Sequence, residues 1–364
     1  MAVSLIGATG IAARAQEPGL PPLPSPWEEV FSVRVGAGYN DNLTLAHSGP
    51  ERAPFIYSGL DAVISRLPVD GNLLNLTVIA DDARFLGGAP VDNESLVLAS
   101  GEARKLFATG WQPGLAAQWF YQDQVLDMST TTTNQQPLPV RGQTLTARPG
   151  VRLELAPRWW VAVEAPVTRQ FFDEPLDDYW EGGAKESLGF AYGHKSEVTA
   201  SYETIHRGYD EDPALDAEGV PSLGDKSKAL WQHDVRLVWR HHWDERRQWR
   251  TTAKLGFKAN RDNASGYFDF NRYQAAGQVR YRARAWTLTG EAAVYQYHYE
   301  VQTTGGPGTP RRERTEVTVG VRCERQIAKA WQVFAEYDHD RVTGNLAWEE
   351  YSVNKVKAGV NWTF

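Results

Sequence analysis

The chain has 364 residues, of which 23% are charged and 12% aromatic, with a formal net charge of -7. This acidic balance argues against nucleic acid as the partner, because nucleic-acid-binding domains usually carry a basic surplus on the binding face. The mean hydropathy is -0.47 and no apolar run approaches the ~18–20 residues of a spanning helix, so a helical membrane protein is excluded. The single cysteine, Cys323, excludes an intrachain disulfide and a cysteine cluster for a metal.

The N-terminal residues carry the features of an export signal. Residues 2–12 are weakly apolar, and Ala13-Arg14-Ala15 before Gln16 has the small-x-small pattern of a cleavage site. We therefore expect residues 1–15 to be a signal peptide, although the stretch is short and lacks a basic start. Residues 16–29 follow, with five prolines between Glu17 and Pro26, and this composition predicts a stiff, extended periplasmic lead-in.

From residue 30 onward, apolar and polar residues alternate with a period of two. Phe31, Val33 and Val35, for example, alternate with Ser32 and Arg34. This period is typical of strands whose two faces meet different surroundings. It predicts sixteen strands, at residues 30–40, 55–67, 72–86, 93–107, 111–125, 140–155, 159–172, 180–193, 196–208, 228–242, 249–260, 267–284, 286–301, 312–324, 331–341 and 351–364. The alternation is blurred in 180–193 and 286–301, and without these two the number of strands is fourteen.

The connections between these strands alternate in length along the chain. Short periplasmic turns facing long extracellular loops are the pattern of a transmembrane β-barrel. We therefore expect an all-β, antiparallel up-and-down barrel over residues 30–364, with both termini in the periplasm. The short connections are 68–71, 108–110, 156–158, 193–195, 244–248 and 284–285, and the long ones are 41–54, 126–139, 209–227, 261–266, 303–311 and 343–349.

Aromatic residues recur at a spacing that fits two membrane interfaces. Eight steps of ~3.3 Å, tilted by ~40°, span roughly 20 Å along a barrel axis, close to the ~25 Å apolar band between the aromatic girdles of such barrels. A soluble sandwich or propeller with an aromatic core is the alternative, since those folds also have alternating strands. The pairs that stand eight residues apart on one face are Trp231 and Trp239, Trp249 and Phe257, and Tyr273 and Tyr281.

The last strand has apolar residues at alternate positions and ends on an aromatic residue: Val356, Ala358, Val360, Trp362 and Phe364. This pattern resembles the C-terminal signal by which the barrel assembly machinery recognises outer-membrane β-barrel proteins. Residues 38–42 (GYNDN), 337–345 and 351–364 are similar to segments of β-barrel porins associated with exopolysaccharide-synthesis loci. The resemblance implies a conduit in the outer membrane of a Gram-negative bacterium, in contact with lipid and lipopolysaccharide, rather than an enzyme.

The alternation also assigns charged residues to the inside of the barrel. Three consecutive strands would carry a basic wall, and a focused field of one sign is how pores select ions. We therefore expect preference for a small polar, anionic solute, for which a saccharide is one candidate. The alternative is that lumen charges pair with one another and stiffen a narrow lumen. The basic wall is Arg236, Arg240, Arg250, Lys254, Lys258, Arg280, Arg282 and Arg284, and acidic residues of the same phase are Glu164, Glu197, Glu203, Glu316, Glu324, Glu336, Asp338 and Asp340.

Two other classes of function stay open. A lipid-modifying barrel enzyme would place a nucleophile and a histidine on the outer wall, where His206 and His233 fall, but we find no serine or carboxylate beside them to complete a catalytic set. A structural or adhesive barrel would have a blocked lumen, with the loops at 126–139 and 209–227 as its working parts. The acidic residues of the second loop, Asp210, Glu211, Asp212, Asp216, Glu218 and Asp225, lack the spacing of a calcium loop. We expect no catalytic residue, cofactor or metal site, and the barrel could be monomeric or trimeric.

Overall fold

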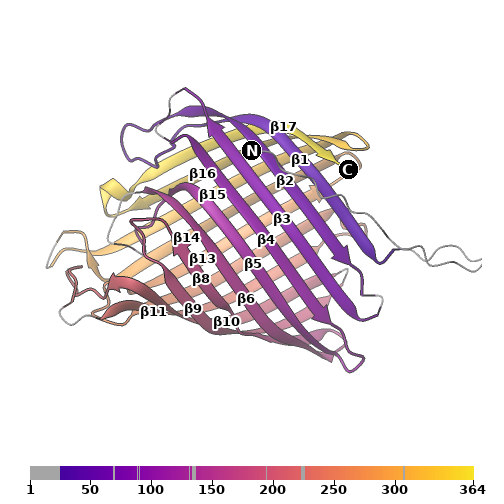
Figure 1. Cartoon of the computed structure of the whole chain (residues 1–364), viewed down its shortest axis with the longest axis horizontal. Helices are drawn as coiled ribbons and strands as arrows, with labels where there is room; N and C mark the ends of the chain where they lie inside the picture. The colour runs from indigo at the N-terminus through magenta and orange to yellow at the C-terminus, as the bar shows by residue number, and fades with distance from the viewer. Residues whose placement is uncertain are drawn as a thin grey trace, which may run out of the picture.

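The computed structural model describes residues 25–364, apart from residues 69, 88, 90, 131, 133–136, 194, 223–225 and 306–307. The expected signal peptide (1–15) and residues 16–24 of the lead-in lie outside the described residues. The described chain forms one antiparallel sheet in which β1 (Trp27–Asn40) pairs with both β2 (Ala53–Arg66) and β17 (Tyr351–Thr363) (Figure 1). The sheet therefore closes into a barrel, which removes the free edges of an open sheet.

The other strands follow one another around the barrel in chain order, as expected for an up-and-down topology. They alternate with short turns and longer loops, and one short 3-10 helix, η1 (Ala347–Glu349), lies in the connection before β17. The strands are β3 (Asn72–Phe85), β4 (Asn93–Lys105), β5 (Trp111–Leu126), β6 (Leu138–Ala156), β7 (Trp159–Glu164), β8 (Val167–Phe172), β9 (Tyr179–Tyr192), β10 (Ser196–Pro213), β11 (Ser227–His242), β12 (Trp249–Asp262), β13 (Phe270–Arg282), β14 (Trp286–Thr303), β15 (Arg311–Ala328) and β16 (Trp331–Gly344).

The short strands β7 and β8 are two halves of one strand of the barrel. Both pair with β6 on one side and with β9 on the other, and the register does not change between them. The break falls at Ala165 and Pro166, because proline has no N–H to donate to the ladder. The barrel thus has sixteen strands, which confirms the predicted fold class, and the fourteen-strand alternative is wrong.

The strand boundaries differ from the prediction mainly at the strand ends. β1 begins at Trp27, so the last residues of the expected lead-in belong to the barrel, and β10 and β15 run on to Pro213 and Ala328. Both chain ends lie at the same end of the barrel, because Ser32 pairs with Thr363. The short turns 106–110, 157–158 and 329–330 lie at this end, which we call periplasmic, since the short turns of outer-membrane barrels face the periplasm.

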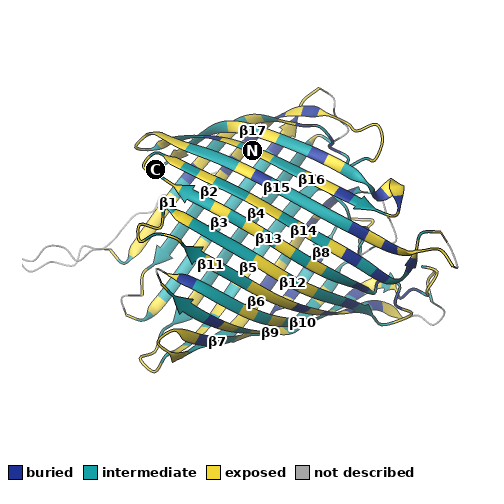
Figure 2. Ribbon diagram, turned by 180° about the vertical axis from the view of Figure 1, so that it is seen from behind, coloured by how far each residue is buried: buried dark blue, intermediate teal, exposed yellow. Residues whose placement is uncertain are grey.

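Exposed and less exposed residues alternate along the strands of the wall (Figure 2). The polarity of the two faces is the reverse of that in a soluble protein. Large apolar side chains such as Val35, Leu237 and Leu255 are exposed on the outer face, whereas polar side chains such as Asp234 and Gln232 are buried inside. This apolar-out, polar-in alternation is that of a transmembrane barrel, so the soluble sandwich or propeller is wrong. No helix among the described residues is long and apolar enough to cross a membrane.

Buried apolar side chains gather inside the barrel from its extracellular mouth inward. One cluster packs Leu43, from the loop after β1, against Phe55 and Phe85. A second packs Leu215, from the loop after β10, with Tyr209, Leu230 and Phe268. Extracellular segments therefore fold into the mouth of the barrel and pack there.

Candidate functional site

The expected basic wall lies on the inner face of β11, β12 and β13. Its members share that face with the buried Asp234, as the strand register shows: Asp234 pairs with Lys258, and Arg250 pairs with Arg280. Arg284 is the exception, since β13 ends at Arg282 and Arg284 lies in the following turn. The strands thus place Arg236, Arg240, Arg250, Lys254, Lys258, Arg280 and Arg282 on one side of the lumen.

In the extracellular part of this wall, one buried acid pairs with two of the cations, whereas Lys258 forms no ion pair among the described residues. The carboxylate of Asp234 lies 2.6 Å from a guanidinium nitrogen of Arg236 and 3.9 Å from one of Arg272. Arg272 is a member of the wall that our sequence analysis missed, although it has the same strand phase as Arg280. Its side chain also lies over the ring of Tyr295, with 5.5 Å between the guanidinium carbon and the ring centre.

Towards the periplasmic end, the positive charges of the wall are not paired with any carboxylate that the structure describes. Within the described part of the chain, Arg240, Lys254, Arg280 and Arg282 have no carboxylate at ion-pair distance. Glu197 stands opposite Arg240 in register, but its carboxylate accepts a hydrogen bond from Thr199 at 2.8 Å instead.

Several carboxylates on the other side of the lumen are paired. Glu336 on β16 lies 2.7 Å from Lys357 and 2.6 Å from Arg322. Asp61 lies 2.9 Å from Arg34, which also contacts Asp81 at 3.0 Å. Asp338 and Asp340 of β16 form no ion pair among the described residues. The expectation that lumen charges pair with one another therefore holds for part of this side, while the basic wall keeps uncompensated cations.

A second basic set, on β4 to β6, was also missed by the sequence analysis. Arg104 and Arg152 pair with neighbouring glutamates, whereas Arg148 has no ion pair among the described residues and is exposed towards the lumen. Trp160 lies beside them with its ring under Arg152, 4.1 Å from the guanidinium carbon to the ring centre. Trp160 is buried against Gly189, so it packs the wall instead of offering a free ring to a solute.

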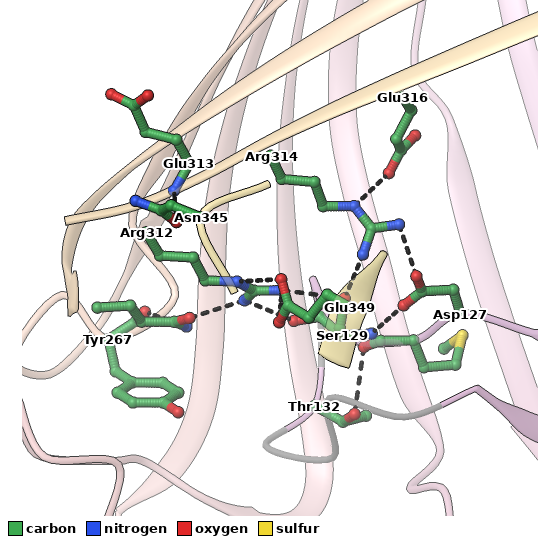
Figure 3. A network of polar contacts seen from close by, with 12 residues as sticks. Asp127, Ser129, Thr132, Tyr267, Arg312, Glu313, Arg314, Glu316, Asn345 and Glu349 are labelled. Atoms are coloured by element: carbon green, nitrogen blue, oxygen red, sulfur yellow. Dashed lines mark hydrogen bonds and ion pairs between the residues drawn. The ribbon is translucent and has the colours of Figure 1, made fainter. Parts of the chain in front are cut away.

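Asp127 and Ser129, which follow β5, lie beside Arg312 and Arg314 of β15 (Figure 3). Ser129 is fully buried and accepts hydrogen bonds from Arg312 and Arg314 at the start of β15. The strands β4, β3, β2, β1, β17 and β16 stand between β5 and β15 on the shorter way round the barrel. Residues 127–130 of the segment between β5 and β6 therefore turn across the mouth rather than rise away from it.

One buried ion pair, between Arg314 and Asp127, fastens the crossing, and ion pairs to Glu316 and Glu349 hold the two arginines in place. Arg314 lies 2.6 Å from Asp127 and 2.8 Å from Glu316. Arg312 lies 2.7 Å from Glu349 of η1, and the side chains of both are 1% exposed. Arg312 also donates to the carbonyl of Ser129 at 3.1 Å and to Gln302 at 2.7 Å. We call Asp127, Ser129, Arg312, Arg314 and Glu349 the mouth latch.

Burial affects the protonation of Glu349, one of the residues of the mouth latch. It raises the pKa of the Glu349 carboxyl, although the positive charges of Arg312 and Arg314 oppose that shift. Beside the latch, a cavity of about 310 Å³ opens between Met128 and the start of β11. Phe172, Tyr179, Arg207 and Phe268 are among the residues that line it.

The aromatic residues of the expected girdles form two groups on the outer face. Trp249 packs on Tyr281 with ring centres 4.4 Å apart, and Phe257 packs on Tyr273 at 5.3 Å. Trp231 packs on His206 at 4.5 Å, while Trp239 donates a hydrogen bond to Tyr192 at 2.6 Å. The spacing of eight residues thus separates a periplasmic group (Trp239, Trp249, Tyr281) from an extracellular one (Trp231, Phe257, Tyr273).

The residues of the expected assembly signal lie at the closing seam of the barrel. Val356, Ala358, Val360 and Trp362 pair with outward residues of both β16 and β1. Phe364 packs on Trp362 with ring centres 4.8 Å apart and on Phe31 at 6.0 Å.

The outer wall carries a carboxylate that the sequence analysis did not weigh. Glu186 of β9 points outward beside Tyr202, because the two are register partners. It lies outside the strands 196–208, 228–242 and 249–260, which were searched for a catalytic set around His206 and His233. His233 is hydrogen-bonded to Tyr202 at 2.8 Å, and no contact among the described residues links either histidine to a hydroxyl nucleophile and a carboxylate together. The described residues also contain no group of three metal-ligating side chains.

The acidic loop after β10 is partly neutralised. Asp210 lies 2.6 Å from Arg169, and Asp212 lies 2.5 Å from Lys228. Asp216 accepts hydrogen bonds from the backbone of Glu218 and Val220. Asp225 lies outside the described residues.

Comparison with known proteins supports the fold. No protein-family model and no curated protein matches this sequence. A BenF-like porin from Pseudomonas fluorescens Pf-5 has a TM-score of 0.50 at 9% identity, covering 93% of this chain and 99% of that one. OccAB1 from Acinetobacter baumannii has a TM-score of 0.48 at 9% identity, covering 93% and 96%. The fold shared with the BenF-like porin and the apolar outer wall together identify a transmembrane β-barrel of the outer-membrane type.

Proposed function

We propose that this barrel is a porin-like or exporter-like conduit whose lumen favours a small polar, anionic solute. The observation that carries the proposal is the uncompensated part of the basic wall, Arg240, Lys254, Arg280 and Arg282. Cations in a confined lumen raise the local concentration of anions, because low-dielectric walls focus their field.

The cross-strand arrangement of the wall supports a functional origin. Arg250 stands directly opposite Arg280, and like charges in that position destabilise a sheet. The Arg250 side chain bonds Gln278 at 2.9 Å and leaves its Nε buried without a partner. A wall selected for stability alone would place a carboxylate there, whereas a wall that attracts a passing anion would not.

A hollow in the wall offers room for such a solute. Ala276 and Ala293 leave a space of about 260 Å³ beside Lys254, with Gln274, Gln278 and the carboxylate of Glu291 among its lining residues; Glu291 accepts a hydrogen bond from Gln278 at 3.1 Å. Amide, hydroxyl and ammonium groups of this kind can bind a hydroxylated acid, so a saccharide acid is within the proposed class. The mouth latch favours a second candidate, a structural barrel with a blocked lumen, because it holds the β5–β6 segment across the entrance.

Solute uptake into proteoliposomes separates the two candidates. We expect liposomes with the wild-type barrel to take up glucuronate faster than glucose, which has nearly the same size but no charge. The variant Arg240→Glu/Lys254→Glu/Arg280→Glu should reverse that order, while Arg84→Glu on the outer face should preserve it. Equal, slow uptake of both solutes by a correctly folded barrel would contradict the conduit and favour the blocked lumen.

A further inference from the structure

One charged side chain stands at mid-depth on the lipid-facing side of the barrel. Glu186 is an outward residue of β9, midway between the outward aromatics Trp180 and Tyr192 of the same strand. Glu186 is six positions from Trp180 and six from Tyr192, which is roughly 15 Å along the axis of a barrel with tilted strands. Its register partners are Val163 and Tyr202, so Glu186 lies in the middle of the apolar band.

The carboxylate of Glu186 has no hydrogen bond or ion pair among the described residues. Other charged residues of the outer face, such as Asp82 and Arg169, lie near strand ends and have partners. An ionisable group at mid-depth that faces acyl chains is costly and marks a functional surface by default. A glutamate side chain is too short to reach either membrane interface, so something other than lipid must cover it.

Polar groups continue from Glu186 across the neighbouring strands. Tyr202 pairs with Glu186, Thr204 pairs with His233, and His206 lies next along β10. Tyr202 and His233 are joined by a 2.8 Å hydrogen bond between the phenol oxygen and Nδ1. We call Glu186, Tyr202, Thr204, His206 and His233 the outer-wall patch.

We propose that the outer-wall patch is the contact surface between two copies of this chain, related by a two-fold axis along the membrane normal. Such an axis places the same patch of both copies face to face, and residues of equal depth meet. Glu186 and Tyr202 are register partners and therefore lie at similar depth. Each copy thus presents a hydrogen-bond acceptor where the other presents a donor.

The Tyr202–His233 hydrogen bond fits this arrangement. When His233 Nδ1–H donates to the phenol oxygen, the phenol proton is free to donate to the Glu186 carboxylate of the second copy. Two such bonds form per dimer, one on each side of the axis. Gly182, Ala184 and Ala200, which face outward around the patch, are small enough to let the two walls approach closely.

Disulfide cross-linking of the full chain in native outer membranes tests the proposal. Thr204→Cys in a Cys323→Ser background places a thiol inside the patch, and oxidation should yield a species of twice the chain mass. Val35→Cys in the same background is the matched control, since Val35 is exposed on β1, far round the barrel, and it should remain monomeric. Heat-modifiability on gels shows that each variant is folded.

The mass of the protein without introduced cysteines, measured by light scattering in lipid nanodiscs, provides the second readout. The wild type should be dimeric, and Glu186→Leu should shift the equilibrium towards monomer roughly tenfold or more, because two hydrogen bonds are lost. Glu186→Gln, which keeps an acceptor, should lie between them. A monomeric or trimeric wild type, a Thr204→Cys cross-link to another protein, or a Glu186→Leu dimer as stable as the wild type would each overturn the proposal.

Discussion

Replacing Arg312 with methionine should release the β5–β6 segment from the mouth of the barrel. The substitution keeps an unbranched side chain but removes the contacts to Ser129, Gln302 and Glu349. It also leaves the Glu349 carboxylate buried without its nearest cation. Removing one partner of a buried ion pair costs about 3–5 kcal/mol, mainly because the other charge stays desolvated.

This cost sets the size of the expected effect. At about 1.4 kcal/mol per factor of ten, the equilibrium between latched and released segment should move by roughly 10²–10³-fold. A segment that is released only rarely in the wild type would then be released for a substantial part of the time. The double variant Arg312→Met/Glu349→Leu should recover much of the latch, because an apolar pair can replace a buried ion pair at little cost.

Single-channel recording and external proteolysis of intact cells can follow this release. Arg312→Met should increase the conductance and expose the β5–β6 segment to protease, while the double variant should return towards wild-type behaviour. Arg84→Met is the control, since Arg84 forms a surface ion pair with Asp82 and such pairs contribute only about 0–1 kcal/mol. Unchanged conductance and unchanged cleavage in a folded Arg312→Met barrel would refute the latch.

Three further predictions test other parts of the account. Because the pKa of Glu349 is raised by burial, the latch should be most stable in acid and weaken as the pH rises through that raised pKa. Single-channel closed times should therefore shorten as the pH rises, and Glu349→Gln should remove this pH dependence. Gly189→Ala would place a methyl group against the Trp160 ring and should lower the free energy of unfolding in urea by about 1–3 kcal/mol. Gly277→Ala, with open space around it, should leave that free energy unchanged. Phe364→Ser removes the packing on Trp362 and Phe31 and should lower the yield of heat-modifiable barrel in the outer membrane; an undiminished yield would contradict a role in assembly.

The barrel could be predicted from sequence because its physical signal is repeated in every strand. The alternation seen at Phe31–Val35 recurs around the whole wall, and each short turn limits where the next strand begins. The prediction was least accurate at strand ends such as Trp27 and Pro213, since apolar and polar faces meet the same solvent beyond the membrane. The phase of the basic wall follows from the same alternation, and Arg272 could have been found that way.

The mouth latch could not be predicted, because its members are far apart in sequence. Ser129 and Arg312 are separated by 183 residues, and no periodicity relates a loop to the opposite wall of a barrel. Glu186 was missed for a different reason: the glycines and alanines of β9 blur its alternation, so the outward phase is visible only from the pairing with β7 and β10. Local sequence patterns thus predict the strands of the barrel wall, while contacts across the lumen can be found only from the structure.

The reversal potential of single channels in a planar bilayer under a salt gradient tests the central claim most directly. The account predicts discrete current steps with a reversal potential on the anion-selective side, lost when Arg240, Lys254 and Arg280 are changed to glutamate. A silent membrane that contains a correctly folded barrel, or open channels with cation preference, would contradict it.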